Sequence, residues 1–424
     1  MGSGGRPGVG AAMAAWFVLA MFYFYQYVAR SCPAVMLPQL SEGLGISALA
    51  VASLVGLFYY GYSPFSLVSG AAMDRLGAAR VVPAAAAMVG IGALLFATGH
   101  PAAAGCGRFL QGAGGVFALI GAIDVATRAF PPGKAATLIG ATQMCGMAGG
   151  SVGQFAVGPL IASGVTWRAF WIGMGVAGLL IGAVLMLILP KGKPAAPAGG
   201  SKPGLAAAFG LVFRNPQSIL CGLIAGLLFI PTTIFDMVWG VRYLQEGHGL
   251  EYAEAVLRSA AVPFGWIVGC PLLGFISDRL GRRKPVILGG ALMVFACTAW
   301  ALYGRADALP PYVVGLAMGV ASGAAMIPYT VVKEANPPSL GGTATGVINF
   351  VNFTLSALLG PLFAAALRRA SGGAATMALE HYRAAFTPLL YGIAGAIVLT
   401  LLLKETGRAG RALPATAAAV RSPT

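Results

Sequence analysis

The stretch Gly70–Arg80, GAAMDRLGAAR, places one aspartate, two arginines and two glycines between long apolar runs. A similar stretch, GFISDRLGRR, lies at Gly274–Arg283. Four residues recur at one offset of 204 positions: Gly70, Asp74, Arg75 and Gly77 match Gly274, Asp278, Arg279 and Gly281. The pair Gly158-Pro159 similarly recurs as Gly360-Pro361, at an offset of 202. These matches indicate that the chain is a duplicated unit.

The rest of the sequence is unusually apolar. Of 424 residues, 58% are hydrophobic and 9% are charged, against about 25% charged in soluble domains. Runs of about 20 apolar residues, the length that a helix needs to cross a bilayer, fill most gaps between polar clusters. We expect spans at 12–38, 48–72, 82–99, 103–126, 136–163, 168–190, 217–244, 253–277, 286–304, 309–331, 342–368 and 383–404. The runs do not alternate as β-barrel strands do, so the sequence predicts an all-α polytopic membrane protein with twelve transmembrane helices in two six-helix repeats.

The repeats define a domain plan. We expect an N-terminal six-helix bundle over 1–190 and a C-terminal bundle over 215–406. Between them, 191–214 contains the run KGKPAAPAGGSKPG, whose Pro, Gly and Lys content indicates a flexible cytoplasmic linker. Residues 407–424 read as a disordered cytoplasmic tail.

The net charge of +15 is better explained by topology than by nucleic acid, because the basic residues lack interleaved aromatic residues and a soluble domain to carry them. Most of the Lys and Arg fall in segments that share one face if both termini are cytoplasmic, as the positive-inside rule requires. We therefore expect a multi-pass protein of the plasma (inner) membrane. The six cysteines have no CxxC spacing, so neither a metal nor another cofactor is expected.

The repeated loop pattern GxxxDRxGxxR resembles the signature loop of the major facilitator superfamily. The segment RFLQGAGG at Arg108–Gly115 resembles the fourth-helix pattern of that superfamily, and Gly146–Pro159 loosely resembles a fifth-helix pattern of its exporters, with a different spacing. The resemblance implies the major facilitator fold and alternating access. It also implies that the two loops gate the halves; the alternative is a tight turn with topogenic charge. The expected gating residues are Gly70, Asp74, Arg75, Gly77, Arg80, Gly274, Asp278, Arg279, Gly281, Arg282 and Arg283.

Charged residues inside the spans are expensive in a bilayer and so indicate a cavity or a partner. Arg30, with Tyr27 one helical turn before it, resembles the first helix of organophosphate:phosphate antiporters and, more loosely, of anion:cation symporters. In those relatives an arginine here binds the anionic group of the substrate. Snorkelling of Arg30 toward the headgroups is the alternative.

Two further charges are candidates. The antiporters use a second arginine in the seventh helix, where this chain has Thr233, so a two-arginine clamp is not expected. Asp236 in the same helix is a candidate cation, proton or substrate site, or a partner in a fixed ion pair. Arg108 matches an arginine that the family implicates in coupling; pairing with polar groups at its helix end is the alternative.

Uncharged polar residues complete the predicted binding site. Asn349 and Asn352 share one helix face, and the others lie in spans that line the pore in this fold. Hydrogen bonding between helices is the alternative role for each asparagine. The complete predicted set is Arg30, Tyr27, Gln26, Gln143, Asp236, Trp239, Asn349 and Asn352.

These observations predict a secondary active transporter for a small organic solute, favouring an organic anion because of Arg30. It would be driven by a proton or a counter-solute and act as a monomer in the lipid bilayer. The alternatives are a drug or multisolute exporter and a non-transporting membrane sensor on the same scaffold. An enzyme is not expected, because the sequence has no HExxH or P-loop motif.

Overall fold

The computed structural model describes residues 9–130, 132–189, 205–305, 310–337, 340–374 and 376–407. Within these ranges, a few side chains are not described, including those of Asp74 and Arg75. Every regular element in the described part of the chain is a helix. The first half comprises α1 (Val9–Ser31), η1 (Cys32–Met36), α2 (Leu37–Leu44), α3 (Ala48–Leu76), α4 (Ala78–Ala97), α5 (Pro101–Ala129), α6 (Pro132–Phe155), α7 (Val157–Ala162) and α8 (Trp167–Ile188).

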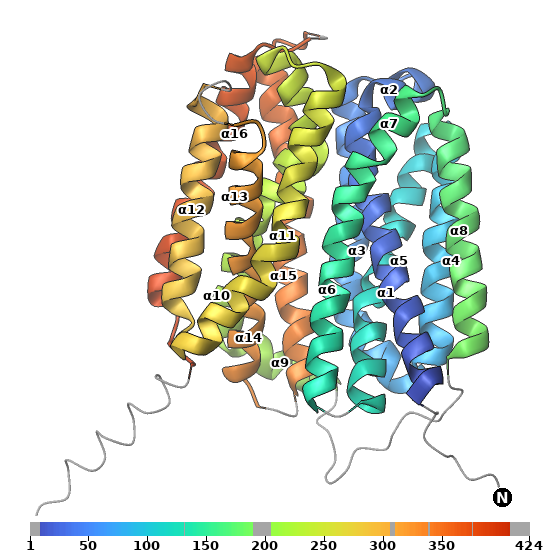
Figure 1. Cartoon of the computed structure of the whole chain (residues 1–424), viewed down its shortest axis with the longest axis vertical. Coiled ribbons are helices and arrows are strands. Elements are labelled where there is room, and N and C mark those ends of the chain that lie inside the picture. Colours follow the sequence, from blue (N-terminus) through green and yellow to red (C-terminus); the bar gives the residue numbers. More distant parts are fainter. Residues whose placement is uncertain are drawn as a thin grey trace, which may run out of the picture.

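The second half repeats this plan with more interruptions. It comprises α9 (Leu205–Arg214), α10 (Pro216–Ile230), η2 (Pro231–Gly240), η3 (Tyr243–Gly247), α11 (Tyr252–Leu280), α12 (Lys284–Tyr303), α13 (Val313–Ser322), η4 (Gly323–Met326), α14 (Ile327–Glu334), α15 (Gly341–Ala370) and α16 (Leu379–Leu402). The halves stand side by side, with α2 and α7 at one end and α9 and α14 at the other (Figure 1). We call these the α2 end and the α9 end.

The twelve-helix prediction is confirmed. Among the described residues, eleven helical segments are long and apolar enough to span a membrane, and α6 completes the twelve. The described part of α6 is rich in Gly and also contains Thr142, Gln143, Ser151 and Gln154, which lowers its hydropathy. Because α6 packs on both α1 and α11, these small and polar residues face protein rather than lipid.

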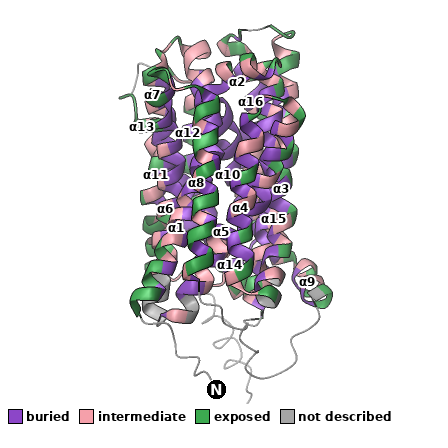
Figure 2. Cartoon of the chain, turned by 90° about the vertical axis from the view of Figure 1, so that its right-hand side faces the viewer, coloured by how far each residue is buried: buried purple, intermediate pink, exposed green. Residues whose placement is uncertain are grey.

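Helix α8 shows how the bundle meets lipid. Its buried face carries Gly175, Gly178 and Gly182, which lie against α4. Its other face exposes large aliphatic residues, and Leu187 is 83% exposed. Figure 2 shows the same division between buried and exposed helix faces across the molecule. Apolar residues on the outside and small residues at the contacts are typical of helix packing in membranes.

The repeat extends to the closest helix contacts. A Cβ on Gly61 of α3 would lie 2.1 Å from the carbonyl oxygen of Phe109 on α5. A Cβ on Gly265 of α11 would lie 2.4 Å from the carbonyl oxygen of Leu316 on α13. Gly61 and Gly265 are separated by the same 204 positions as the loop motifs. The two halves therefore share backbone-to-backbone contacts that admit no larger residue.

Two helices break near the middle of the bundle. Proline has no N–H to donate within a helix, and α1 gives way to the 3₁₀ turn η1 at Pro33. Helix α10 continues from Pro231 as the π-helix η2 and then η3. π-Helical segments are rare and often lie at functional sites.

The predicted linker contains a helix. Residues Leu205–Arg214 form α9, in which Ala208 and Val212 are buried. Phe213 of α9 lies edge-on to Phe350 of α15, with ring centroids 6.1 Å apart. This part of 191–214 therefore packs against the second half. Residues 190–204, with the Pro- and Gly-rich run, and the predicted tail beyond Gly407 lie outside the described residues.

Candidate solute-binding site

A central cavity of about 280 Å³ lies between the halves. Helices α1, α3, α5 and α6 line it from one side, and α10, α11, α14, α15 and η4 from the other. It extends from the rings of Tyr27, Tyr62 and Phe353 toward Ile123, near the end of α5, and Lys333, near the end of α14. The cavity therefore reaches toward the α9 end.

At the α2 end the halves are in contact. The Tyr252 hydroxyl donates to the carbonyl oxygen of Val35 over 2.5 Å, which joins α11 to η1. Ser151 Oγ of α6 donates to the carbonyl oxygen of Ala260 over 3.1 Å. These contacts join the two halves at this end, where residues of both halves also line a separate and larger opening of about 790 Å³.

Arg30 lies directly behind the inner wall of this cavity and is only 2% exposed. Its guanidinium carbon is surrounded by five aromatic rings, at 4.5 to 5.7 Å from their centroids. These rings are Tyr27, Phe58, Tyr59, Tyr62 and Phe353, which we call the ring cage. Three of them, Tyr27, Tyr62 and Phe353, also line the cavity.

The ring cage leaves the arginine without hydrogen bonds. None of the three guanidinium nitrogens has an acceptor in hydrogen-bonding geometry within the described structure. Cation–π contacts of about 0.5–2 kcal/mol each stabilise the charge, but they supply no acceptor for the N–H groups. Snorkelling, the alternative for Arg30, does not fit this burial. The site thus holds a buried cation with five unused N–H donors.

Polar groups from both halves line the cavity beside the ring cage. Tyr329 donates from its hydroxyl to Asn349 Oδ1 over 2.6 Å and accepts from Asn352 Nδ2 over 3.0 Å. Tyr23 donates to Gln143 Oε1 over 3.3 Å. Asn352 Oδ1 remains without a partner among the described residues. The predicted Gln143, Asn349 and Asn352 therefore lie together on the cavity, with Tyr27.

Other predicted residues lie elsewhere. Gln26 is fully buried, with neither amide atom paired in the described structure, and it does not line the central cavity. Trp239 is 1% exposed and packed in the core. Asp236 also lies outside the central cavity. Gln26, Trp239 and Asp236 therefore do not line the central cavity, although the sequence predicted them to be part of the binding site.

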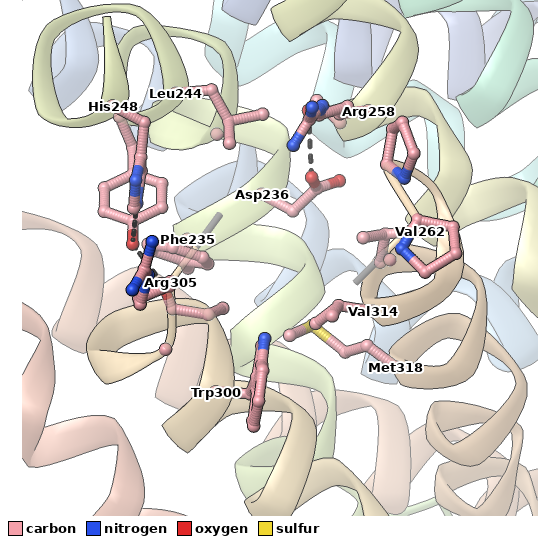
Figure 3. A pocket seen from close by; sticks show the side chains of 18 residues that line it. Phe235, Asp236, Leu244, His248, Arg258, Val262, Trp300, Arg305, Val314 and Met318 are labelled. Carbon is pink, nitrogen blue, oxygen red and sulfur yellow. Dashed lines mark hydrogen bonds between the residues drawn. The ribbon is translucent and has the colours of Figure 1, made fainter. Parts of the chain in front are cut away.

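Asp236 lines a second cavity, of about 100 Å³, inside the C-terminal half. Figure 3 shows its carboxylate among side chains from η2, α11, α12 and α13. Asp236 Oδ1 accepts from Ser259 Oγ over 2.9 Å, while Oδ2 has no partner in the described structure. Arg258, on the same cavity, is bonded to Glu254. The π-helix η2 explains the placement, because its wider turn changes the face on which Asp236 lies.

Arg108 is bound to the scaffold. Its guanidinium donates to the carbonyl oxygens of Ala29 and Val55 over 2.9 and 3.3 Å, and to Gln111 Oε1 over 2.6 Å. The carbonyl of Ala29 needs this donor, because the residue four positions on is Pro33, which has no N–H. Arg108 therefore ties α1, α3 and α5 together where α1 breaks.

In each signature loop the preceding helix ends at a glycine with positive φ. Gly77 has φ 78° and Gly281 has φ 63°, in the left-handed region that favours glycine. Arg80, Arg279 and Arg282 are exposed, and Gly70 and Gly274 have open space where a Cβ would stand. The side chains of Asp74 and Arg75 lie outside the described part.

The second loop forms a charged network within its own half. Arg283 binds Asp278 over 2.5 Å and Glu334 over 2.9 Å. Glu405 accepts from the backbone N–H groups of Arg283 and Lys284 over 2.7 and 3.2 Å. Partial burial opposes ionisation of Glu405, but these N–H groups prevail and lower its pKa. The network joins α11, α12, α14 and the segment after α16, and its described contacts do not reach the N-terminal half.

Two similar helical bundles with a central cavity between them form the architecture of a membrane transporter. The Major Facilitator Superfamily model matches residues 19–361. The chain therefore belongs to the major facilitator superfamily, as the signature loops predicted. Its assignment to the organophosphate or anion:cation branch is not established by this match.

Three relatives are similar over different shares of the chain. An uncharacterized MFS-type transporter of Mycobacterium tuberculosis is 26% identical over 82% of this chain and 68% of its own length. An MFS-type efflux pump of Mycolicibacterium smegmatis is 24% identical over 66% of each. Myo-inositol transporter 2 of Cryptococcus neoformans is 33% identical over 30% of this chain. The chain spans only 23% of that relative's length.

Solved structures share the fold. A bacterial homolog of the human lysosomal transporter Spinster, in an inward-facing unoccupied conformation, has a TM-score of 0.69 at 16% identity, over 94% of this chain and 96% of its own. A D-xylose-proton symporter has a TM-score of 0.67 at 15% identity, over 93% and 97%. These likenesses extend the fold assignment to almost the whole chain.

Proposed function

We propose that the protein is a secondary active transporter that moves a small organic anion by alternating access. The observation that carries the proposal is Arg30, a cation buried behind the wall of the central cavity with no hydrogen-bonding partner in the described structure. A carboxylate or phosphate would supply the paired, charge-assisted hydrogen bonds that a guanidinium forms best.

Energetics favour an anionic ligand at this position. A charge in a membrane-spanning segment costs about 2.5–3.5 kcal/mol on insertion scales, and it is usually compensated by hydrogen bonds. Arg108, whose guanidinium also lies over the Phe58 ring, satisfies this need with two carbonyl oxygens and Gln111. Arg30 has only rings. An arginine whose N–H groups have no acceptor is suited to bind an anionic ligand that enters through the cavity.

The transport cycle follows from the two-bundle architecture. We infer that the α9 end faces the cytoplasm, with the described chain starting and finishing there (Figure 1), so that this conformation receives solute from inside. Rocking of the halves would open the α2 end. Asp236, with one free carboxylate oxygen, is our candidate for a coupled proton, and a counter-solute is the other source of drive. A monomer suffices, because one chain provides the whole cavity.

The test is solute binding and counterflow with the full-length protein, purified and reconstituted in liposomes. A panel of organic carboxylates, phosphate esters, uridine, xylose and lipophilic amines is applied to wild type, Arg30→Gln and Arg30→Lys. The matched control is Arg369→Gln, which removes an exposed arginine of α15. We expect an anion to bind and exchange in wild type and the control, to fail with Arg30→Gln, and to bind weakly with Arg30→Lys, which lacks the planar fork.

Three results would overturn the proposal. Anion exchange by Arg30→Gln at the wild-type rate would show that the guanidinium is structural. Transport limited to lipophilic amines would favour an exporter, the activity named for the mycobacterial relative. Binding of a solute with no exchange in any liposome would favour a membrane sensor.

A further inference from the structure

We propose that the anion is an aromatic monocarboxylate, whose ring lies among the cavity rings and whose carboxylate pairs with Arg30. This inference rests on the proposed function and narrows its substrate class. It follows from three features of the central cavity: the density of aromatic rings, the amount of positive charge and the position of the amides.

Aromatic rings dominate the cavity wall. Six of its lining residues carry them: Tyr23, Tyr27, Tyr62, Phe229, Tyr329 and Phe353. Tyr62 and Phe353 come from different halves, yet their centroids are 4.4 Å apart at an angle of 61°. Aromatic faces and edges favour another ring over an aliphatic group of equal size, because offset and edge-to-face pairs gain energy beyond burial.

The positive charge near the rings matches one negative charge. Arg30 is the cation directly behind the rings that line the cavity. Arg108 also lies over Phe58 of the ring cage, at 5.1 Å, but it does not line the cavity and its guanidinium is bonded to Ala29, Val55 and Gln111. Lys333, on the cavity, lies near the end of α14. A single guanidinium forms two parallel bonds with a single carboxylate. A dianionic phosphate would bring a second charge to a wall made of rings, and burying an unpaired charge is costly.

Access to Arg30 passes between the rings that the ligand would contact. Tyr27, Tyr62 and Phe353 border both the cavity and the guanidinium. A carboxylate attached directly to a ring would reach Arg30 while the ring stays against Tyr62 and Phe353. A charged group at the end of a long aliphatic chain would gain no such contact.

Amides from both halves of the cavity suit polar substituents on the ring. Asn352 Oδ1 has no partner among the described residues and lies on α15 with Asn349, while Gln143 lines the cavity from α6 of the other half. These amides can bond to a hydroxyl group. The cavity volume of about 280 Å³ is just below the range of roughly 300–1,000 Å³ for drug-sized ligands. A single substituted ring is therefore the favoured occupant.

The experiment compares two probes of the same charge and nearly the same size. Benzoate and cyclohexanecarboxylate are titrated into the purified full-length protein by calorimetry, and phenyl phosphate is added as a third probe. We expect benzoate to bind about tenfold tighter than cyclohexanecarboxylate, as one or two aromatic pairs provide. We expect 4-hydroxybenzoate to bind tighter still, and phenyl phosphate to bind more weakly than benzoate.

Matched variants connect this preference to the ring wall. Tyr62→Leu should reduce the benzoate preference to about twofold or less, while Tyr62→Phe keeps the ring and the preference. Phe363→Leu alters a buried ring of α15 that stacks on Phe386, away from the cavity, and should keep it. If Tyr62→Leu does not fold, the probe comparison on wild type and Tyr62→Phe decides the question.

The outcomes separate this inference from the proposed function. Equal affinities for benzoate and cyclohexanecarboxylate, both lost in Arg30→Gln, would overturn the aromatic class and leave the anion carrier standing. Tighter binding of phenyl phosphate than of benzoate would overturn the carboxylate class. No binding of any anion, with uridine or xylose binding equally to wild type and Arg30→Gln, would overturn both.

Discussion

Replacing Arg108 by methionine tests whether this arginine is a structural tie or a coupling residue. The substitution keeps a long side chain that can fill the space between α1, α3 and α5, but it removes every donor. Arg108 is 1% exposed, so water does not replace those donors. The sequence comparison suggested coupling, whereas the contacts indicate that Arg108 holds the α1 break in place.

The cost can be worked out from its partners. Arg108→Met leaves Gln111 Oε1 without a donor and the carbonyl oxygen of Ala29 with only the weak thiol donor of Cys32, at 3.8 Å. A buried unpaired acceptor costs about 1–3 kcal/mol. The carbonyl of Val55 lies inside α3 and keeps its helical bond. Removing the charge recovers part of its desolvation cost. We therefore expect a loss of about 2–4 kcal/mol in the free energy of unfolding.

Equilibrium unfolding in mixed detergent, followed by tryptophan fluorescence, measures this loss. Arg108→Lys, which keeps a single charged donor group, should fall between wild type and Arg108→Met. Arg168→Met is the control: Arg168 is exposed and lies over the Trp167 ring at 5.2 Å, so its loss should change stability by about 0.5 kcal/mol or less. An Arg108→Met protein as stable as wild type but inactive in transport would refute the structural account and return Arg108 to coupling.

Three further substitutions test other contacts. Gly112→Ala puts a Cβ 1.9 Å from the carbonyl oxygen of Phe58, so it should destabilise the protein by about 1–3 kcal/mol. Gly56→Ala is the control, because a Cβ there would have no neighbour within 4 Å. Thermal unfolding should show a lower melting temperature for Gly112→Ala only. Glu334→Gln should lower the melting temperature, because Arg283 loses a charged partner at 2.9 Å; a matching loss in Asp278→Asn, whose side chain is 71% exposed, would contradict this reasoning. Glu405 has a pKa below its ordinary value of 4.5, because four backbone N–H groups outweigh partial burial; its stabilising contribution is thus complete above pH 4.5 and is lost as the pH falls through the lowered pKa. Glu405→Gln should flatten this part of the unfolding profile against pH, and an unchanged acid limb would contradict the assignment.

Much of the fold could be predicted from the sequence because it depends on local pattern. Apolar run lengths located the helices, and two glycines of the signature loops, Gly77 and Gly281, indicated turns that require positive φ. The offset of 204 positions also relates Gly61 to Gly265, which make equivalent close contacts in the two halves. Each of these features is fixed within a few residues of the chain.

The candidate site was less predictable, because an arginine in an apolar run is expected to be buried but its hydrogen-bonding partners cannot be read from the run. Arg30 and Arg108 both lie in apolar runs, yet Arg108 has three hydrogen bonds and Arg30 none in the described structure. The difference depends on where α1 breaks and which helices cross there. Phe58 and Tyr62, four residues apart in α3, had a usable signal, since this spacing puts both rings on one helix face. Phe353 had none, because it comes from the other repeat.

Asp236 shows a second kind of difficulty. Its assignment to the central cavity assumed a regular helix through the seventh span, in which every residue advances by about 100°. The structure has the π-helix η2 there, beginning at Pro231. Its wider turns shift the register, so that Asp236 lies on the cavity inside the C-terminal half. A sequence pattern based on 3.6 residues per turn cannot locate such a change.

The ring cage also bears on how binding and rocking of the halves are linked. Four of its rings belong to the half that carries Arg30, but Phe353 belongs to the other half. Ser63 of α3 donates a hydrogen bond to the carbonyl oxygen of Phe350, which lies one helical turn before Phe353 in α15. Tyr59, also in the cage, donates to the carbonyl oxygen of Thr233 on η2 over 3.4 Å. When the halves separate at the α2 end, the guanidinium must give up contacts with the opposite half while it remains buried. On the proposed function, a carboxylate bound to Arg30 replaces these contacts and travels with its half, so the loaded carrier would lose less electrostatic stabilisation during the conformational change than the empty one.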